Sequence, residues 1–150
     1  MVNIALVGCN GKMGKAVTSA VQSRNDCEIV FGADPFGTPA YDYPVFESLA
    51  VSDKKADVII DFSNPASLDD ILAYALEKKI PCVLCTTGYS PEQVEKIKKA
   101  SESVAVFYSG NMSLGINLLI ELSKEAAKIL SAADFDIEIV EKHHNQKIDA

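Results

Sequence analysis

The chain has 150 residues, of which 48% are hydrophobic and 23% are charged. These proportions are typical of a globular domain and exclude a disordered or fibrous protein. Fourteen basic and 21 acidic residues give a formal net charge of −7 without any basic block, which argues against nucleic acid and anionic membrane as partners. No apolar run approaches the ~18 residues that span a bilayer. No signal peptide is visible, so we expect a cytoplasmic protein.

The four cysteines are Cys9, Cys27, Cys82 and Cys85. Most of them lie in apolar runs, where a free cysteine behaves as a small buried hydrophobic residue. Cys82 and Cys85 have CxxC spacing, but they lie inside a predicted strand. A redox CxxC motif lies at a helix N-terminus instead. Two cysteines and two distant histidines are too few for a zinc site. We therefore predict free structural thiols and no metal.

Apolar runs alternate with amphipathic segments over the first 110 residues. The expected strands are residues 2–7, 27–33, 58–62, 81–85 and 104–108, and the expected helices are residues 12–23, 65–79 and 90–101. Residues 35–44 are rich in proline and predict a loop. Such alternation predicts an α/β fold, a Rossmann-like doubly wound parallel sheet.

The pattern changes after Asn111. Residues 114–130 predict a long helix whose narrow polar stripe indicates burial on most sides. Residues 135–142 alternate in polarity and predict a strand with one solvated face. We therefore expect a dinucleotide-binding domain at 1–111 and the incomplete beginning of an α+β substrate and oligomerisation domain at 112–150. One strand cannot bury its apolar face alone, so we expect another chain or further sequence to complete it.

A glycine motif, GxxGxxG, is formed by Gly8, Gly11 and Gly14 directly after the first strand and at the start of the first helix. Glycines in this position permit a tight turn, and the helix N-terminus favours a pyrophosphate. Asp34 ends the second strand, where an acid binds the adenosine ribose. The alternatives are a turn without a ligand and an aspartate that only forms a turn before Pro35.

The choice between NADH and NADPH stays open in the sequence. Asp34 favours NADH, because a carboxylate repels a 2′-phosphate. Lys12 in the glycine motif favours NADPH if its ammonium pairs with that phosphate, and is otherwise a plain solvated lysine.

Small polar residues follow three of the predicted strands, at 61–64, 85–88 and 109–112. The carboxyl ends of parallel strands meet at one sheet edge, which is the usual binding crevice. We predict that these loops bind nicotinamide and ribose, although each could also be only a cap or a turn.

Both histidines, His143 and His144, lie with Lys147 just past the last predicted strand. Histidine donates a proton near neutral pH, and lysine binds an anion or donates a proton. The segment is therefore a candidate catalytic site or a polar turn.

Five segments in this order, GCNGKMG, DFSNP, CTTGYS, SGNMSLGINLL and EKHHNQKIDA, resemble the 4-hydroxy-tetrahydrodipicolinate reductases, also called dihydrodipicolinate reductases. The resemblance extends over essentially all 150 residues and is most specific in the last two segments. It implies hydride transfer from NADH or NADPH, with release of water from a small dicarboxylate substrate, in lysine and diaminopimelate biosynthesis. It also implies a homotetramer and a chain that continues past Ala150.

The same resemblance implies roles for individual residues. His143 would be the general acid, Lys147 the second proton-transfer or anion-binding group, and His144 a substrate contact. The cofactor would be bound at its pyrophosphate by Gly8, Cys9, Asn10, Gly11, Lys12 and Met13, at its ribose by Asp34, and at its nicotinamide end by Cys85, Thr86, Thr87, Ser109, Gly110, Asn111 and Met112.

Two other functions fit part of the pattern: a non-catalytic NAD(H)-binding module and another small-molecule reductase of similar fold. A module of the first kind has no use for the His143–Lys147 segment. A reductase of the second kind would share the N-terminal motifs without that segment.

Overall fold

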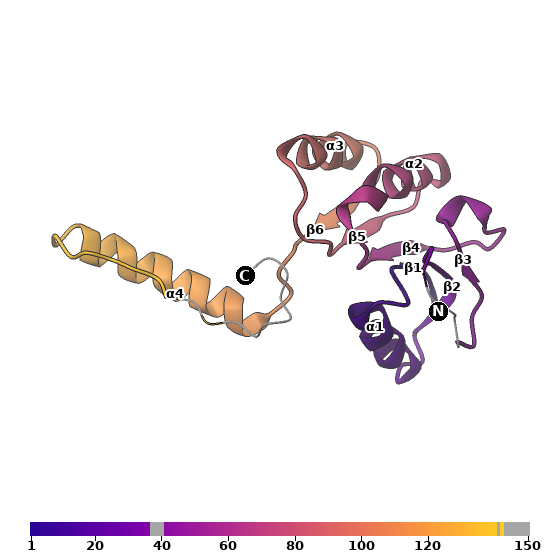
Figure 1. The fold of residues 1–150 in the computed structure, drawn as a ribbon, viewed down its shortest axis with the longest axis horizontal. Helices are drawn as coiled ribbons and strands as arrows, with labels where there is room; N and C mark the ends of the chain where they lie inside the picture. Colours follow the sequence, from indigo (N-terminus) through magenta and orange to yellow (C-terminus); the bar gives the residue numbers. More distant parts are fainter. Residues whose placement is uncertain (37–40, 141, 143–150) are drawn as a thin grey trace. The chain divides into compact units, whose positions relative to one another are not determined.

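The computed structural model describes residues 1–36, 41–140 and 142. The chain divides into two compact units, Met1–Gly110 and Asn111–Ala150. The first unit holds the sheet and the second begins with a long helix (Figure 1). The roles expected for the two parts of the chain, cofactor binding and substrate binding, stay predictions at this point.

The first unit is built on one parallel sheet with strand order β3-β2-β1-β4-β5-β6. The strands are β1 (Val2–Val7), β2 (Cys27–Ala33), β3 (Val45–Phe46), β4 (Val58–Asp61), β5 (Cys82–Leu84) and β6 (Val106–Tyr108). The order runs outward in both directions from β1, so the sheet is doubly wound and the predicted fold class is confirmed. The two-residue strand β3 was not predicted, because a pair of apolar residues after a proline-rich loop carries no periodic signal.

Helices cover both faces of this sheet. Helix α1 (Lys12–Gln22) lies on one face, and α2 (Leu68–Lys78) and α3 (Pro91–Ser101) lie on the other (Figure 1). Short 3₁₀ turns at Leu49–Val51 and Pro65–Ser67 complete the unit.

Local signals set the helix starts. Ser90 and Gln93 form a capping box at the start of α3, in which each side chain accepts a hydrogen bond from the other residue's backbone N–H. The Asn64 side chain accepts from the backbone N–H of Ala66 and caps the 3₁₀ turn before α2.

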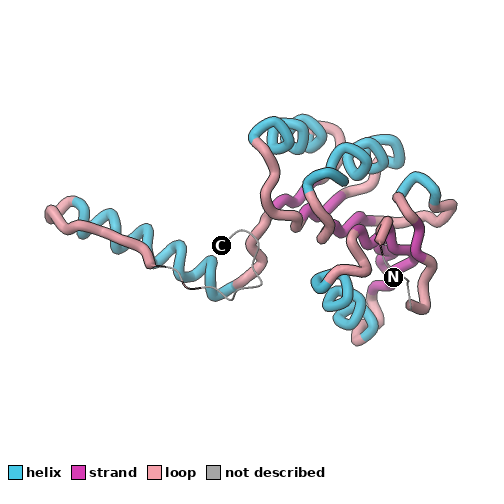
Figure 2. The backbone as a smooth tube through the Cα atoms, in the orientation of Figure 1, coloured by secondary structure: helices cyan, strands magenta, loops and turns pink. Residues whose placement is uncertain are grey.

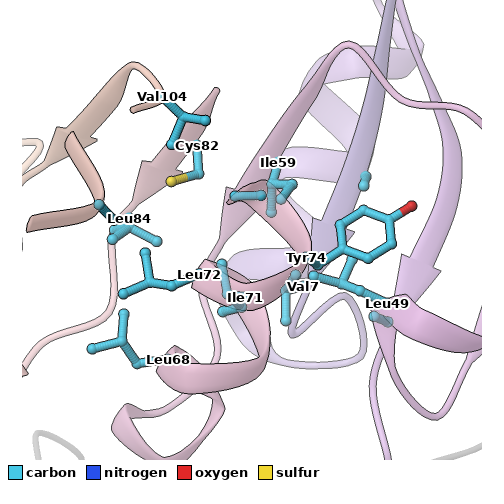
Figure 3. Packing of buried hydrophobic residues seen from close by; sticks show 14 of the residues in the cluster. Val7, Leu49, Ile59, Leu68, Ile71, Leu72, Tyr74, Cys82, Leu84 and Val104 are labelled. Atoms are coloured by element: carbon cyan, nitrogen blue, oxygen red, sulfur yellow. The ribbon is translucent and has the colours of Figure 1, made fainter. Parts of the chain in front are cut away.

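The core is divided by the alternation of side chains along the strands. Ala5 and Val7 of β1 face the larger cluster under α2 and α3, whereas Ile4 and Leu6 face the smaller cluster under α1. Figure 3 shows the larger cluster, in which Leu68, Ile71 and Leu72 of α2 pack on the sheet. All four cysteines are free, as predicted, and three of them are buried.

The second unit corrects two expectations. Helix α4 (Leu114–Ser131) matches the predicted helix, but none of its residues is buried, and Leu114 is 85% exposed. The predicted strand at 135–142 is wrong for the described residues 135–140 and 142, which form no strand (Figure 2). Both differences arise because no neighbouring element packs on these residues. A lone strand has no partner for its backbone N–H and C=O groups, and an apolar helix is buried only where a second layer covers it. Among the described helices, none is long and apolar enough to cross a bilayer.

Candidate functional site

The turn between β1 and α1 is shaped by close packing of its glycines. Gly8 has φ +75°, and a Cβ there would lie 2.6 Å from the carbonyl oxygen of Phe62. A Cβ on Gly14 would lie 2.5 Å from the Cα of Cys9. A Cβ on Gly11 would meet only the Gly8 oxygen, at 3.3 Å. The fold itself therefore requires Gly8 and Gly14, whereas Gly11 leaves the entrance to the α1 N-terminus open.

Asp34, at the end of β2, is tied to this turn. Its Oδ2 accepts a hydrogen bond from the Asn10 backbone N–H at 2.9 Å, and its Oδ1 accepts from the Phe36 N–H at 2.9 Å. The Asn10 amide donates in turn to the Phe36 carbonyl at 2.5 Å. Asp34 therefore does stabilise a turn before Phe36, as one of the two interpretations of the sequence holds. Each of its carboxylate oxygens still has a lone pair that can accept a hydrogen bond from a further donor.

A cavity of about 550 Å³ opens at this end of the sheet. The residues that follow β1, β2 and β4 all contribute to it, among them Gly8, Gly11, Asp34, Phe36, Phe62 and Asn64. The carboxyl ends of parallel strands converge here, as the fold requires. The structure therefore brings together the glycine turn, the acid and the first of the three polar loops.

Two tyrosines brace the glycine turn from the side of β3. The Tyr41 hydroxyl donates to the Cys9 carbonyl at 2.8 Å, and its ring stacks on Tyr43 with centroids 4.8 Å apart. The Tyr43 hydroxyl lies 2.8 Å from the Thr18 hydroxyl of α1. Burial raises the pKa of Tyr43 to about 12. Burial, and then the charge of Asp34, raises the pKa of Cys9 to about 11, so that thiol is structural.

Asp61 is a fully buried carboxylate at the end of β4. It accepts hydrogen bonds from the backbone N–H and the hydroxyl of Ser63, at 2.9 and 2.5 Å, and from the hydroxyl of Tyr89 at 3.1 Å. Burial and the charge of Asp61 raise the pKa of Tyr89, so the phenol stays protonated and donates. Asp61 thereby links the loop after β4 to the loop after β5.

The expected nicotinamide-end residues follow β5 and β6. Ser109 donates its backbone N–H to Leu84 at 3.0 Å, and a Cβ on Gly110 would lie 3.1 Å from the Thr87 methyl group. These two loops therefore lie side by side, although neither lines the cavity beside Asp34. The Thr86 hydroxyl is buried beside Tyr89 and lowers the pKa of that phenol, against the larger, raising effect of burial.

The remaining predicted residues are spread over the chain. Lys12 and Met13 are exposed at the start of α1 and do not line the cavity. Asn111 and Met112 belong to the second unit, where the Asn111 amide donates to the Asn117 side chain at 3.0 Å. His143, His144 and Lys147 lie outside the described residues. The described part of the chain has no cluster of three or more His, Cys, Asp or Glu side chains able to hold a metal ion.

Sequence reasoning missed several residues of the cavity. Phe36, Glu47, Ser48 and Asp70 line it, and none of them belongs to a motif. The sequence predicts Phe62 and Ser63 only as part of a polar loop after a strand. Their position in the DFSNP segment, directly after β4, is the signal that points to them.

Comparison with known proteins assigns the chain to a family. Residues 2–112 match the family model described as "Dihydrodipicolinate reductase, N-terminus", and residues 115–150 match "Dihydrodipicolinate reductase, C-terminus". The chain belongs to the dihydrodipicolinate reductase family. The resemblance stated from the sequence is thereby confirmed.

Individual relatives agree with this membership. The chain is 51% identical over its full length to 4-hydroxy-tetrahydrodipicolinate reductase of Clostridium tetani and 47% identical to that of Clostridium novyi. A dipicolinate-bound dihydrodipicolinate reductase from Paenisporosarcina superposes over the whole chain with a TM-score of 0.77 at 28% identity. The chain covers 58%, 59% and 61% of these three proteins, so it spans about three fifths of their length.

Alanine substitutions distinguish the glycine that the fold needs from the glycine that ligand binding needs. Gly14→Ala should lower the free energy of unfolding by about 3 kcal/mol, because the new methyl group overlaps backbone. Gly11→Ala should cost about 1 kcal/mol but weaken binding of a dinucleotide about tenfold, because its methyl group stands where the ligand approaches. Urea unfolding and calorimetric titration measure the two effects.

Gly115→Ala is the matched control, since Gly115 lies in α4 and a Cβ there would make only an ordinary contact, at 3.8 Å from the Ser113 hydroxyl. It should leave dinucleotide binding unchanged. Wild-type dinucleotide affinity in Gly11→Ala would contradict the assignment of Gly11 to the binding surface.

Removal of the buried carboxylate should destabilise the sheet edge. Asp61→Ala leaves the two donors of Ser63 and the hydroxyl of Tyr89 without their acceptor, and we expect a loss of about 2–4 kcal/mol. Tyr89→Phe removes one donor and its bond together and should cost only about 1 kcal/mol. Urea unfolding of both variants tests this order, and equal losses would show that Asp61 does not organise both loops.

Proposed function

We propose that this protein binds NADH or NADPH in its first unit and reduces 4-hydroxy-tetrahydrodipicolinate to tetrahydrodipicolinate with release of water, in lysine and diaminopimelate biosynthesis. The proposal is supported by membership in the reductase family together with one observation: the glycine turn, the α1 N-terminus and Asp34 line one cavity. The alternative of a non-catalytic module or an unrelated reductase accounts for neither the second family match nor the His143–Lys147 segment.

The residues of the cavity fit a dinucleotide. The open approach at Gly11 exposes the backbone N–H groups at the start of α1, where the helix dipole favours an anion such as a pyrophosphate. Asp34 is acceptor-only and suits two ribose hydroxyls. When bound, the nicotinamide group supplies a hydride.

The chain's own residues supply binding, orientation and the proton. Reduction of a conjugated ring builds electron density that an acid must quench, and His143 is the proposed donor. Lys147 is the proposed second proton-transfer or anion-binding group, and His144 the proposed substrate contact. The relative from Paenisporosarcina is described as bound to dipicolinate, which supports a dicarboxylate substrate here. A lysine beside two histidines gives a local positive region that suits a dianion in a protein of net charge −7.

The roles of Cys85, Thr86, Thr87, Ser109, Gly110, Asn111 and Met112 at the nicotinamide end belong to the same proposal. So do a cofactor domain at 1–111, a substrate domain beginning at 112, a homotetrameric full-length protein and a cytoplasmic location. The exposed apolar side chains of α4 support the second domain assignment, because such a helix needs a covering layer.

Calorimetric titration of the 150-residue chain tests the cofactor assignment. We expect NADH, NADPH or both to bind at one site per chain. Each titration is repeated with pyridine-2,6-dicarboxylate. Tighter cofactor binding in its presence would place the substrate site within these residues, and no effect would place part of it outside them. Failure of both cofactors to bind would overturn the proposal.

His143→Gln tests the acid assignment in the full-length protein. The substitution keeps a side chain that forms hydrogen bonds but cannot carry the proton. Turnover should fall about tenfold or more. Cofactor affinity should change little. Steady-state kinetics and cofactor titration measure the two, and near-normal turnover would remove His143 as the acid.

A further inference from the structure

We propose that Tyr89 is a positioning residue for the nicotinamide end of the cofactor, because its hydroxyl fixes the loop after β5 to the buried carboxylate of Asp61. The inference rests on the proposed function, in which the loops after β5 and β6 hold that end. It goes further by giving a role to Tyr89, which does not line the cavity beside Asp34. Tyr89 acts through the loop that it holds and not through a contact of its own with the cofactor.

The loop after β5 has an exposed tip between two residues that are held. Thr86 is buried and Tyr89 is half-buried, whereas Thr87 and Gly88 between them are exposed. Gly88 has φ +80°, and a Cβ there would meet no atom within 4 Å, so the chain turns through open space at this point. The conformation of the tip therefore depends on how firmly the residues on either side of it are held.

The hydroxyl of Tyr89 holds one side of this tip. It donates to Oδ2 of Asp61 at 3.1 Å, while Oδ1 of the same carboxylate accepts from the backbone N–H and the hydroxyl of Ser63. Asp61 is fully buried, and its backbone carbonyl accepts from the Cys85 N–H at 2.9 Å. The acceptor is therefore fixed in the sheet, and a hydrogen bond to a charged acceptor is about twice as strong as one between neutral groups.

The tip that Tyr89 holds also lies against the loop after β6. A Cβ on Gly110 would lie 3.1 Å from the methyl group of Thr87. The ring of Tyr89 lies against that of Tyr108 at the end of β6, with centroids 5.5 Å apart. A displaced tip would therefore disturb both loops that are proposed to hold the nicotinamide end. A loop already held in its binding conformation loses less freedom when a ligand binds, so the fixed tip raises affinity.

The adenosine side of the site is held by other bonds. Asp34 accepts from the Asn10 N–H in the glycine turn at 2.9 Å. Ser63, which lines the cavity, keeps both of its bonds to Asp61 when the Tyr89 hydroxyl is removed. Loss of that hydroxyl should therefore weaken the contacts of the nicotinamide group and leave those of the adenosine half intact.

Calorimetric titration of the 150-residue chain with ligands that differ at the nicotinamide group tests this separation. NADH is compared with ADP-ribose, and NADPH with the 2′-phosphate of ADP-ribose. In Tyr89→Phe we expect the dissociation constant of the cofactor to rise about fivefold, the size of one typical hydrogen bond. That of the matching nicotinamide-free ligand should change by less than about twofold, because its contacts do not depend on the loop after β5.

Two features make the comparison specific to the Tyr89 hydroxyl. Tyr89→Phe keeps the ring that lies against Tyr108, so the packing of the loop is retained. Tyr74→Phe is the matched control, since it removes a hydroxyl from a buried tyrosine of α2. It should leave the affinity for both members of each ligand pair unchanged.

The outcomes separate this inference from the proposed function. Equal weakening of both members of a pair in Tyr89→Phe reduces Tyr89 to a structural role and overturns the inference, and so does unchanged affinity for both. Equal affinity of the wild type for the cofactor and its nicotinamide-free counterpart also overturns it, because the loops would then hold no nicotinamide group. In each of these cases the proposed function stands. Binding of neither cofactor by the wild type overturns the proposed function itself.

Discussion

The close approach of the glycine turn to the loop after β4 is the constraint on which the binding end of the sheet depends. There is no room for a side chain at Gly8, which faces the Phe62 backbone, or at Gly14, which lies on the backbone of Cys9. With these contacts made, α1 begins directly after the glycine turn, and the Asn10 backbone N–H in that turn donates to Asp34 at the end of β2. A larger residue at either glycine would separate the helix from the sheet and open the cavity.

Buried polar groups hold the rest of this edge in place. Asp61 links the loops after β4 and β5, and Asp34 links the loop after β2 to the glycine turn. Both are carboxylates that accept several hydrogen bonds, but their exposure differs. Asp61 is fully buried and its role is structural, whereas Asp34 is partly exposed and lines the cavity. The same side-chain chemistry thus serves folding at one strand end and recognition at the next.

The second unit shows which structure local signals form without packing against other elements. Its helix α4 forms from local signals, with Ser113 as cap, but the apolar side chains of the helix stay exposed. The relatives are longer, and the chain covers about three fifths of them. Helix formation needs only hydrogen bonds within the segment, whereas a strand needs a neighbour, so α4 is present and residues 135–140 form no strand.

The sequence by itself determined the helices of the first unit and its strands other than β3, the capping box at Ser90, the glycine motif and the family, because each follows from local periodicity or from a contiguous motif. Only the tertiary structure decided that Phe36, Glu47 and Asp70 share a cavity with Asp34, since they come from separate elements and carry no motif. It also decided that both oxygens of Asp34 are occupied by backbone N–H groups. Contacts of this kind depend on how distant segments converge, which periodicity does not encode.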